Sequence, residues 1–300
     1  MIQRALIGLA RMGVDRVLIM RDHGGIAQGL ELAQKNRRKD QPLQWPKLEY
    51  LEMEVGGEAT DTLNAVTMMC EQECRVIIVL GGDGTHRLVA HACGEIPLAC
   101  ISTGTNNVFP KFIESTVAGM AAGALAVKKV QQELVCLRNK RLMLEINGKA
   151  QIPALVDICV TSEDWIGTRA VWRPKDLREL YLSFAEPGAI GLSSIGSLVL
   201  PRARELDEGL EIMMEPSSTN GIKVEAPIAP GLITEINVDS CRPLRLGEPK
   251  SIRIPKGTLA LDGEKEIEFN AEDQVKITLD PLGPWSINVD KIMGMLAKNI

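Results

Sequence analysis

The sequence predicts an α/β domain with a doubly wound, Rossmann-like parallel sheet, followed by a β-sandwich domain. Up to residue 129, apolar strand-like runs alternate with helical patterns of about 10–15 residues, which is typical of βαβ units. From residue 130 onwards, short alternating runs are separated by Gly, Pro and Asn, which is typical of an antiparallel β domain. We therefore predict domains at 1–129 and 130–286, with a C-terminal helix, 287–300, packing back on the first.

The elements of the first domain follow from hydrophobic periodicity. Apolar residues at helical spacing predict five helices, whereas β-branched or continuous apolar runs predict four strands between them. The predicted helices are 2–12, 26–37, 58–73, 85–93 and 116–129, and the predicted strands are 16–20, 48–53, 75–80 and 97–102.

The second domain shows strand and hairpin patterns. Asn147-Gly148 lies between two alternating runs and predicts a tight hairpin. Similar runs occupy 221–230, 250–269 and 273–281. The tail at 289–297 is apolar at helical spacing, so we expect a final helix there.

Composition excludes several classes of function. The 300 residues carry a net charge of −5 and only 3% aromatic residues, and no long basic block occurs, so nucleic acid is not an expected partner. No run approaches the roughly 20 apolar residues of a membrane span. The seven cysteines are scattered without a C-x-x-C pair, which indicates reduced thiols and a cytoplasmic location.

The clearest functional signal is Gly81-Gly82-Asp83-Gly84-Thr85, which follows a predicted strand and opens a helix. Such a turn lies at the carboxyl edge of the sheet, where ligands bind. Glycines let backbone N–H groups approach a ligand, and a helix N-terminus favours phosphate. Asp83 beside a phosphate is explained as a base or as a partner of Mg²⁺. The alternative is a tight turn with Asp83 as a helix cap.

A second polar cluster follows the next predicted strand. It consists of Thr103, Gly104, Thr105, Asn106 and Asn107. Hydroxyl and amide groups next to a glycine suit ribose, phosphate or a base, although an Asn-rich turn is the alternative. Because the two clusters end neighbouring strands, together they predict a nucleotide-binding crevice.

Residues 81–85 resemble the signature shared by NAD kinases, diacylglycerol kinases and sphingosine kinases, whose α/β domain also precedes a β-sandwich. "TGTNNVFP", 103–110, resembles the Gly-Thr-x-Asn loop of the lipid-kinase branch, with Asn107 where that branch usually has Asp. With "GTRAVW", 167–172, and "AIGLSSIG", 189–196, the mixture is most similar to the acetoin-catabolism protein X group of ATP–NAD kinase-like proteins.

The resemblance also implies a second side of the cleft. Asp157 stands where NAD kinases carry an Asn-Asp or Asn-Glu pair that holds the NAD ribose. NAD kinases also carry a Thr-Gly-Ser-Thr-Ala-Tyr segment, of which this sequence keeps Gly188 and Ser193 (or Ser194). Asp262 and Glu264 match an Asp-Gly element that both branches carry near the end of the chain. The alternative for the three carboxylates is that they lie on solvated loops.

What the resemblance implies is ATP- and Mg²⁺-dependent phosphoryl transfer to a hydroxyl of a small or nucleotide-like acceptor, with NAD the leading candidate. Asp83 would be catalytic and the possible Mg²⁺ partner. Gly81, Gly82, Gly84, Thr85 and the cluster 103–107 would hold the nucleotide. The missing half of the ribose pair predicts weak NAD kinase activity at most. Two alternatives stay open: a lipid or sphingoid kinase, and a nucleotide-binding regulator without catalysis. We expect a homo-oligomer.

One expectation concerns the N-terminal side. In the resembled families the first strand ends in an Asn-Pro-x-Ser/Ala-Gly loop that contacts the phosphates, and these 300 residues contain no such motif. We therefore expect residues upstream of Met1, or another element, to lie beside the strand at 75–80.

Overall fold

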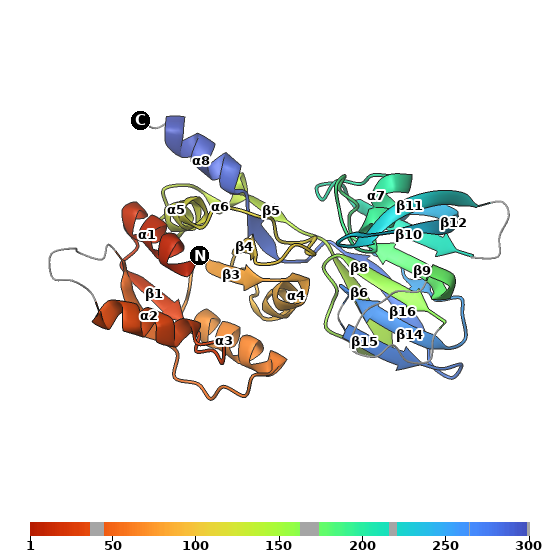
Figure 1. The fold of residues 1–300 in the computed structure, drawn as a ribbon, viewed down its shortest axis with the longest axis horizontal. Coiled ribbons are helices and arrows are strands. Elements are labelled where there is room, and N and C mark those ends of the chain that lie inside the picture. Colours follow the sequence, from red (N-terminus) through yellow and green to blue (C-terminus); the bar gives the residue numbers. More distant parts are fainter. Residues whose placement is uncertain (37–44, 163–173, 216–220, 264, 299–300) are drawn as a thin grey trace.

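The computed structural model describes residues 1–36, 45–162, 174–215, 221–263 and 265–298. They form an α/β domain and a β domain that lie side by side (Figure 1). Among these residues, no helix is both long and apolar enough to cross a membrane.

The α/β domain alternates helices and strands as the sequence predicts, with ends displaced by a few residues. Its elements are α1 (Ile2–Met12), β1 (Arg16–Ile19), α2 (Ile26–Lys35), β2 (Lys47–Tyr50), α3 (Ala59–Glu71), β3 (Ile77–Gly81), α4 (Asp83–Ala92), β4 (Leu98–Ser102), α5 (Ser115–Ala126), α6 (Gln132–Val135) and β5 (Cys136–Arg138). The doubly wound α/β class is therefore confirmed.

The strands of this domain form two sheets. β1 pairs in parallel with β2, and β3 pairs in parallel with β4. The second sheet has the order β3-β4-β17-β5, in which β17 (Trp285–Ile287) runs parallel to β4 and antiparallel to β5. Within the described residues, β3 has a strand partner on its β4 side only.

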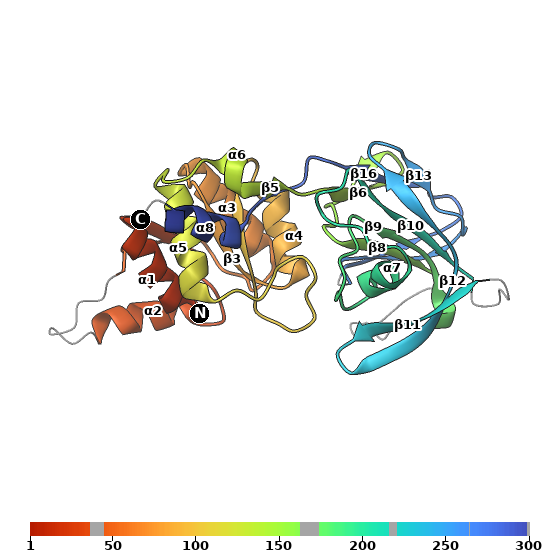
Figure 2. The same ribbon diagram turned by 90° about the horizontal axis from the view of Figure 1, so that it is seen from above.

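Helices α1 and α5 pack closely because each has a glycine where the backbone of the other helix approaches. A Cβ at Gly8 would lie 2.3 Å from the Thr116 carbonyl oxygen, and one at Gly119 would lie 2.2 Å from that of Ala5. The final helix α8 (Val289–Lys298) lies beside α5 (Figure 2). Its Val289 and Ile292 are buried in a cluster with α5 residues. The C-terminal segment thus lies on the first domain.

The β domain is a sandwich. Its elements are β6 (Arg141–Ile146), β7 (Lys149–Ala150), β8 (Asp157–Thr161), a 3₁₀ turn (Pro174–Asp176), β9 (Leu177–Leu182), α7 (Ser193–Val199), β10 (Glu208–Met214), β11 (Ile222–Ala229), β12 (Leu232–Arg245), β13 (Lys250–Ser251), β14 (Gly257–Leu261), β15 (Lys265–Phe269) and β16 (Val275–Asp280). A seven-stranded sheet, β11-β12-β10-β9-β8-β14-β15, packs on a four-stranded sheet, β13-β16-β6-β7. The predicted β-sandwich is confirmed.

Local signals explain the sandwich's details. Asn147 and Gly148 have φ values of 53° and 76°, as the predicted hairpin between β6 and β7 requires. Helix α7 covers the other face of the large sheet, where Leu192 and Ile195 join its core.

The chain passes between the domains twice, next to β5 and next to β17. The Asn139 side-chain amide links the passages, since its Nδ2 donates to the Pro284 carbonyl and the Ser286 hydroxyl, each at 2.9 Å. Val130 and Val135 pack with α5 and α8 in the first domain. We propose that the domain boundaries lie at these passages, near 139 and 284.

Candidate functional site

The loop 81–85 turns from β3 directly into α4. Gly82 is the N-cap in an extended conformation, and the first helical bond runs from His86 N to the Gly82 carbonyl at 3.1 Å. The N–H groups of Gly84 and Thr85 are therefore not bonded within the helix. A Cβ at Gly81 would lie 2.7 Å from Thr85 Cβ, so this glycine is required for the turn itself.

His86 reinforces the turn. Its ring is fully buried, and Nδ1 lies 2.8 Å from the Gly82 carbonyl oxygen. Burial lowers the pKa of His86 to about 4, so the ring is neutral at pH 7. Nδ1 then carries the hydrogen that it donates to this carbonyl.

Asp83 has a structural partner that the sequence did not indicate. Its side chain is only 7% exposed, and the carboxylate accepts hydrogen bonds from the backbone N–H groups of Val108, at 2.9 Å, and Phe109, at 2.8 Å. Because β3 and β4 are adjacent and parallel, the loops that follow them meet at one edge of the sheet. Asp83 thus joins these two loops in addition to any chemical role.

The second loop is shaped by its own side chains. Asn107 Nδ2 donates to Ser102 Oγ at 2.8 Å, and Ser102 Oγ donates to the Gly104 carbonyl at 2.8 Å. Thr103, Thr105 and Asn106 are exposed. Of the predicted nucleotide ligands in this cluster, these three have side chains open to solvent, whereas Asn107 stabilises the loop.

The β domain presents Asp262 to helix α4. Asp262 lies in the turn after β14, where its carboxylate accepts backbone N–H groups from Leu155 at 3.0 Å and Val156 at 2.7 Å. The Oδ2 atom of Asp262 lies 3.8 Å from Nε of Arg87. Arg87 follows Asp83 by one turn of helix α4. Burial raises the pKa of Asp262 to about 7, and Asp83 adds to this, while the two N–H groups and Arg87 act against it.

Asp157 is the least compensated acid of the group. It begins β8, is 6% exposed, and in the described structure its Oδ1 has no hydrogen-bond partner. Burial, together with the nearby charges of Asp262 and Asp83, raises the pKa of Asp157 well above its usual range. Three carboxylates and the Arg87 guanidinium therefore meet where α4 faces the β domain. The alternative that Asp157 and Asp262 lie on solvated loops is wrong.

The fit of the expected ligands differs. Phosphate suits the unbonded N–H groups at the start of α4. Mg²⁺ does not have a preformed site, because nowhere in the described residues are three or more His, Cys, Asp or Glu side chains arranged to hold a metal ion. Mg²⁺ commonly binds through substrate phosphates with only one or two carboxylates, so an ion that arrives with ATP needs no such cluster.

The structure does not bring every predicted residue to these loops. Ser193 is fully buried and its Oγ donates to the Ile190 carbonyl at 3.1 Å, so its hydroxyl is not open to a ligand. Gly188 lies in an exposed turn with a φ of 80°. Glu264 and the segment 167–172 lie outside the described residues.

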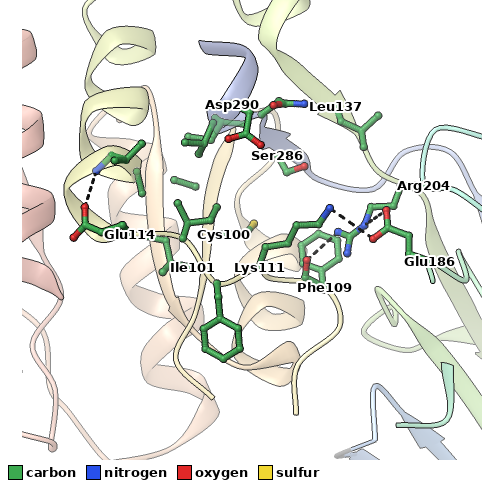
Figure 3. A pocket seen from close by; sticks show the side chains of 18 of the residues that line it. Cys100, Ile101, Phe109, Lys111, Glu114, Leu137, Glu186, Arg204, Ser286 and Asp290 are labelled. Atoms are coloured by element: carbon green, nitrogen blue, oxygen red, sulfur yellow. Dashed lines mark hydrogen bonds and ion pairs between the residues drawn. The ribbon is translucent and has the colours of Figure 1, made fainter. Parts of the chain in front are cut away.

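Sequence reasoning missed Arg87 and Arg204. A signal existed for Arg87, because residues four apart share a helix face and Asp83 opens the helix. Arg204 follows no motif, yet it contacts the second loop from the β domain (Figure 3).

A cavity of about 470 Å³ lies behind the second loop, between β4, β17 and the starts of α5 and α8 (Figure 3). Its β-domain wall is formed by Glu186, Arg204 and Glu205. Residues 81–85 do not line it. Residues 103–107 do not line it either, although Phe109 at the end of the second loop does.

Comparison with known proteins assigns the family. Residues 7–129 match the ATP-NAD kinase N-terminal domain, and residues 140–282 match the acetoin catabolism protein X C-terminal domain. The chain is 40% identical over 295 residues to "Acetoin catabolism protein X" of Cupriavidus necator (strain ATCC 17699 / DSM 428 / KCTC 22496 / NCIMB 10442 / H16 / Stanier 337), covering 97% of this chain and 82% of that protein. The chain belongs to the acetoin catabolism protein X family.

Solved structures are similar at much lower identity. An NAD kinase from Archaeoglobus fulgidus in complex with ATP matches with a TM-score of 0.42 and 13% identity, over 95% of this chain and 97% of that one. A putative diacylglycerol kinase from Bacillus anthracis str. Sterne matches with a TM-score of 0.43 and 16% identity, over 92% and 96%. For this acetoin catabolism protein X family member, the predicted resemblance to NAD kinases is confirmed by the match of residues 7–129 to the ATP-NAD kinase N-terminal domain.

Proposed function

We propose that the protein transfers a phosphoryl group from ATP to a hydroxyl of a small or nucleotide-like acceptor. The observation that carries the proposal is the joining of two loops at the carboxyl edge of the sheet, where Asp83 of one loop bonds the backbone of the other. The match of residues 7–129 to the ATP-NAD kinase N-terminal domain supports a nucleotide as the donor.

The proposed roles follow from the geometry. The N–H groups of Gly84 and Thr85 bind phosphate oxygens, and Gly81 and Gly82 keep the turn open enough for their approach. The exposed side chains of Thr103, Thr105 and Asn106 bind the nucleoside part. ATP enters as its Mg²⁺ complex, in which the ion lowers the charge on the phosphates.

Asp83 is the proposed base. As the acceptor oxygen bonds to the γ-phosphorus, the bond to ADP breaks and the hydroxyl proton passes to the Asp83 carboxylate. This role requires the carboxylate to exchange at least one of its backbone bonds for the acceptor hydroxyl. Catalytic hydrogen bonds often tighten only when substrate is bound, so the present contacts are compatible with that step.

The experiment is a screen of candidate hydroxyl acceptors with γ-labelled ATP and Mg²⁺, run beside Asp83→Asn. We expect a labelled product with at least one small or nucleotide-like acceptor, and loss of that product in the variant. If no acceptor is labelled while the protein binds ATP, phosphoryl transfer is refuted.

One observation favours a second function, that of a nucleotide-binding regulator. The Asp83 carboxylate is buried and engaged with Val108 and Phe109, which is also what a purely structural aspartate would do. ATP binding without any product would support this second function.

A further inference from the structure

Arg204 reaches from the β domain to the second loop of the α/β domain. Its Nη1 donates to the Phe109 carbonyl at 2.9 Å, and its Nη2 donates to the Val108 carbonyl at 2.7 Å. The residue is only 8% exposed. These bonds are made by a charged donor and are therefore stronger than those between neutral groups.

The same two peptide units are held from the other side by Asp83. The N–H groups of Val108 and Phe109 bond to Asp83, and their carbonyls bond to Arg204. Every backbone donor and acceptor of this dipeptide is thus used by a charged side chain, one from each domain. A loop fixed in this way has little freedom at its C-terminal end.

Apolar and ionic contacts orient the Arg204 side chain. Its guanidinium carbon lies 4.1 Å from the ring centroid of Phe184 and 5.2 Å from that of Phe109, which is the geometry of cation–π contacts. Glu186 lies 3.2 Å from Arg204 Nε and 3.8 Å from Lys111 Nζ, which follows the loop (Figure 3). The Phe109 ring is buried with Leu155 and Phe184 of the β domain.

We propose that Arg204 is a positioning residue, which holds loop 103–109 in the shape that binds the nucleotide and couples that shape to the position of the β domain. This inference rests on the proposed nucleotide site. Thr103, Thr105 and Asn106 belong to the same short loop as the clamped dipeptide, separated from it by Asn107, so release of Val108 and Phe109 lets their side chains move. Binding would then require the loop to be ordered at the cost of affinity.

The test compares three arginine variants. Arg204→Met removes both bonds, Arg204→Lys keeps a charge that reaches one carbonyl, and Arg202→Met is the control. Arg202 lies two residues away and pairs with Glu208 inside the β domain at 2.5 Å. The readouts are the Kd for Mg²⁺–ATP by calorimetry and the hydrogen exchange of the Val108 and Phe109 amides.

For Arg204→Met we expect a Kd raised roughly tenfold to a hundredfold, because two bonds from a charged donor are lost. Amide exchange at 108–109 should accelerate in the same variant. Arg204→Lys should recover part of both effects, and Arg202→Met should match the wild type. A Kd within threefold of wild type together with unchanged exchange in Arg204→Met would overturn the proposal.

Glu186→Gln provides a milder test if Arg204→Met does not fold. It leaves the bonds to Val108 and Phe109 but weakens the ion pair that orients the guanidinium, so a smaller change in the same direction is expected. No change in either readout would count against the inference. A wild-type chain that does not bind Mg²⁺–ATP overturns the proposed function, and the exchange data alone then decide whether Arg204 orders the loop.

Discussion

Replacement of Asp157 by asparagine should stabilise the protein, and by more as the pH rises. Asp157 is 6% exposed, its Oδ1 has no partner in the described structure, and its pKa is raised well above 3.8 by burial and by the charges of Asp262 and Asp83. Ionising this carboxyl in the folded state is therefore unfavourable. Asparagine is neutral at every pH and has nearly the same shape, so it removes that cost.

The magnitude follows from the protons that each state binds. The folded pKa values of Asp157 and Asp262 lie above their ordinary value of 3.8, so both groups stabilise the fold at low pH and lose this contribution as pH rises through the folded pKa. The pKa of His86 is lowered from 6.5 to about 4, so between these pH values His86 makes the free energy of unfolding rise with pH. Each bound proton changes the free energy of unfolding by about 1.4 kcal/mol per pH unit.

Between about pH 5 and about pH 6.5, the falling contribution of Asp262 and the rising contribution of His86 oppose each other, and Asp157 lowers the free energy of unfolding further as its carboxyl ionises. In Asp157→Asn the contribution of Asp157 is gone, while those of Asp262 and His86 remain. The advantage of the variant over the wild type should therefore grow as pH rises above the ordinary Asp pKa of 3.8, by at most the slope for one proton, about 1.4 kcal/mol per pH unit.

The assay is urea unfolding followed by circular dichroism at several pH values, with Asp15→Asn as the control because Asp15 is exposed. The control should have a pH profile parallel to that of the wild type. If Asp157→Asn is also parallel to the wild type, Asp157 does not have a raised pKa, and the reasoning about the buried acids is refuted.

Three further predictions concern activity and assembly. Asp83→Asn should lower phosphoryl transfer by on the order of 10²-fold through loss of the base, and should lower the free energy of unfolding by about 1 kcal/mol through weaker bonds to the second loop; activity within threefold of wild type would defeat the catalytic assignment. NADP formation from NAD should be weak at most, because half of the expected ribose pair is the apolar Val156; robust turnover in a coupled assay would show that this departure has been overinterpreted. Light scattering should give the mass of a homo-oligomer, and a mass near 32.7 kDa would contradict that expectation.

The sequence predicts the elements of this fold well because its periodic patterns are local. The strands before residues 81–85 and 103–107 were predicted within a few residues, and so was the meeting of the two loops at one sheet edge. Helix α8 and the Asn147-Gly148 hairpin also follow from short-range patterns.

The contacts that close the site are long-range, and no short-range pattern marks them. Asp83 bonds residues 25 and 26 positions away, and Arg204 bonds carbonyls 95 and 96 positions away. The membership of β17 in the first sheet depends on the chain returning from the second domain. Asp157 is buried near Asp262 and Asp83, which are far from it in the chain, so its charge state could not be inferred from its neighbours in sequence.

The central claim is that the loops at 81–85 and 103–107 form one nucleotide site. Hydrogen exchange of the wild-type protein with and without Mg²⁺–ATP tests it most directly. We predict that ATP protects the amides of Gly84, Thr85 and residues 103–107 together. Protection of neither loop at saturating ATP, or protection confined to the cavity between β4, β17 and α8, would contradict it.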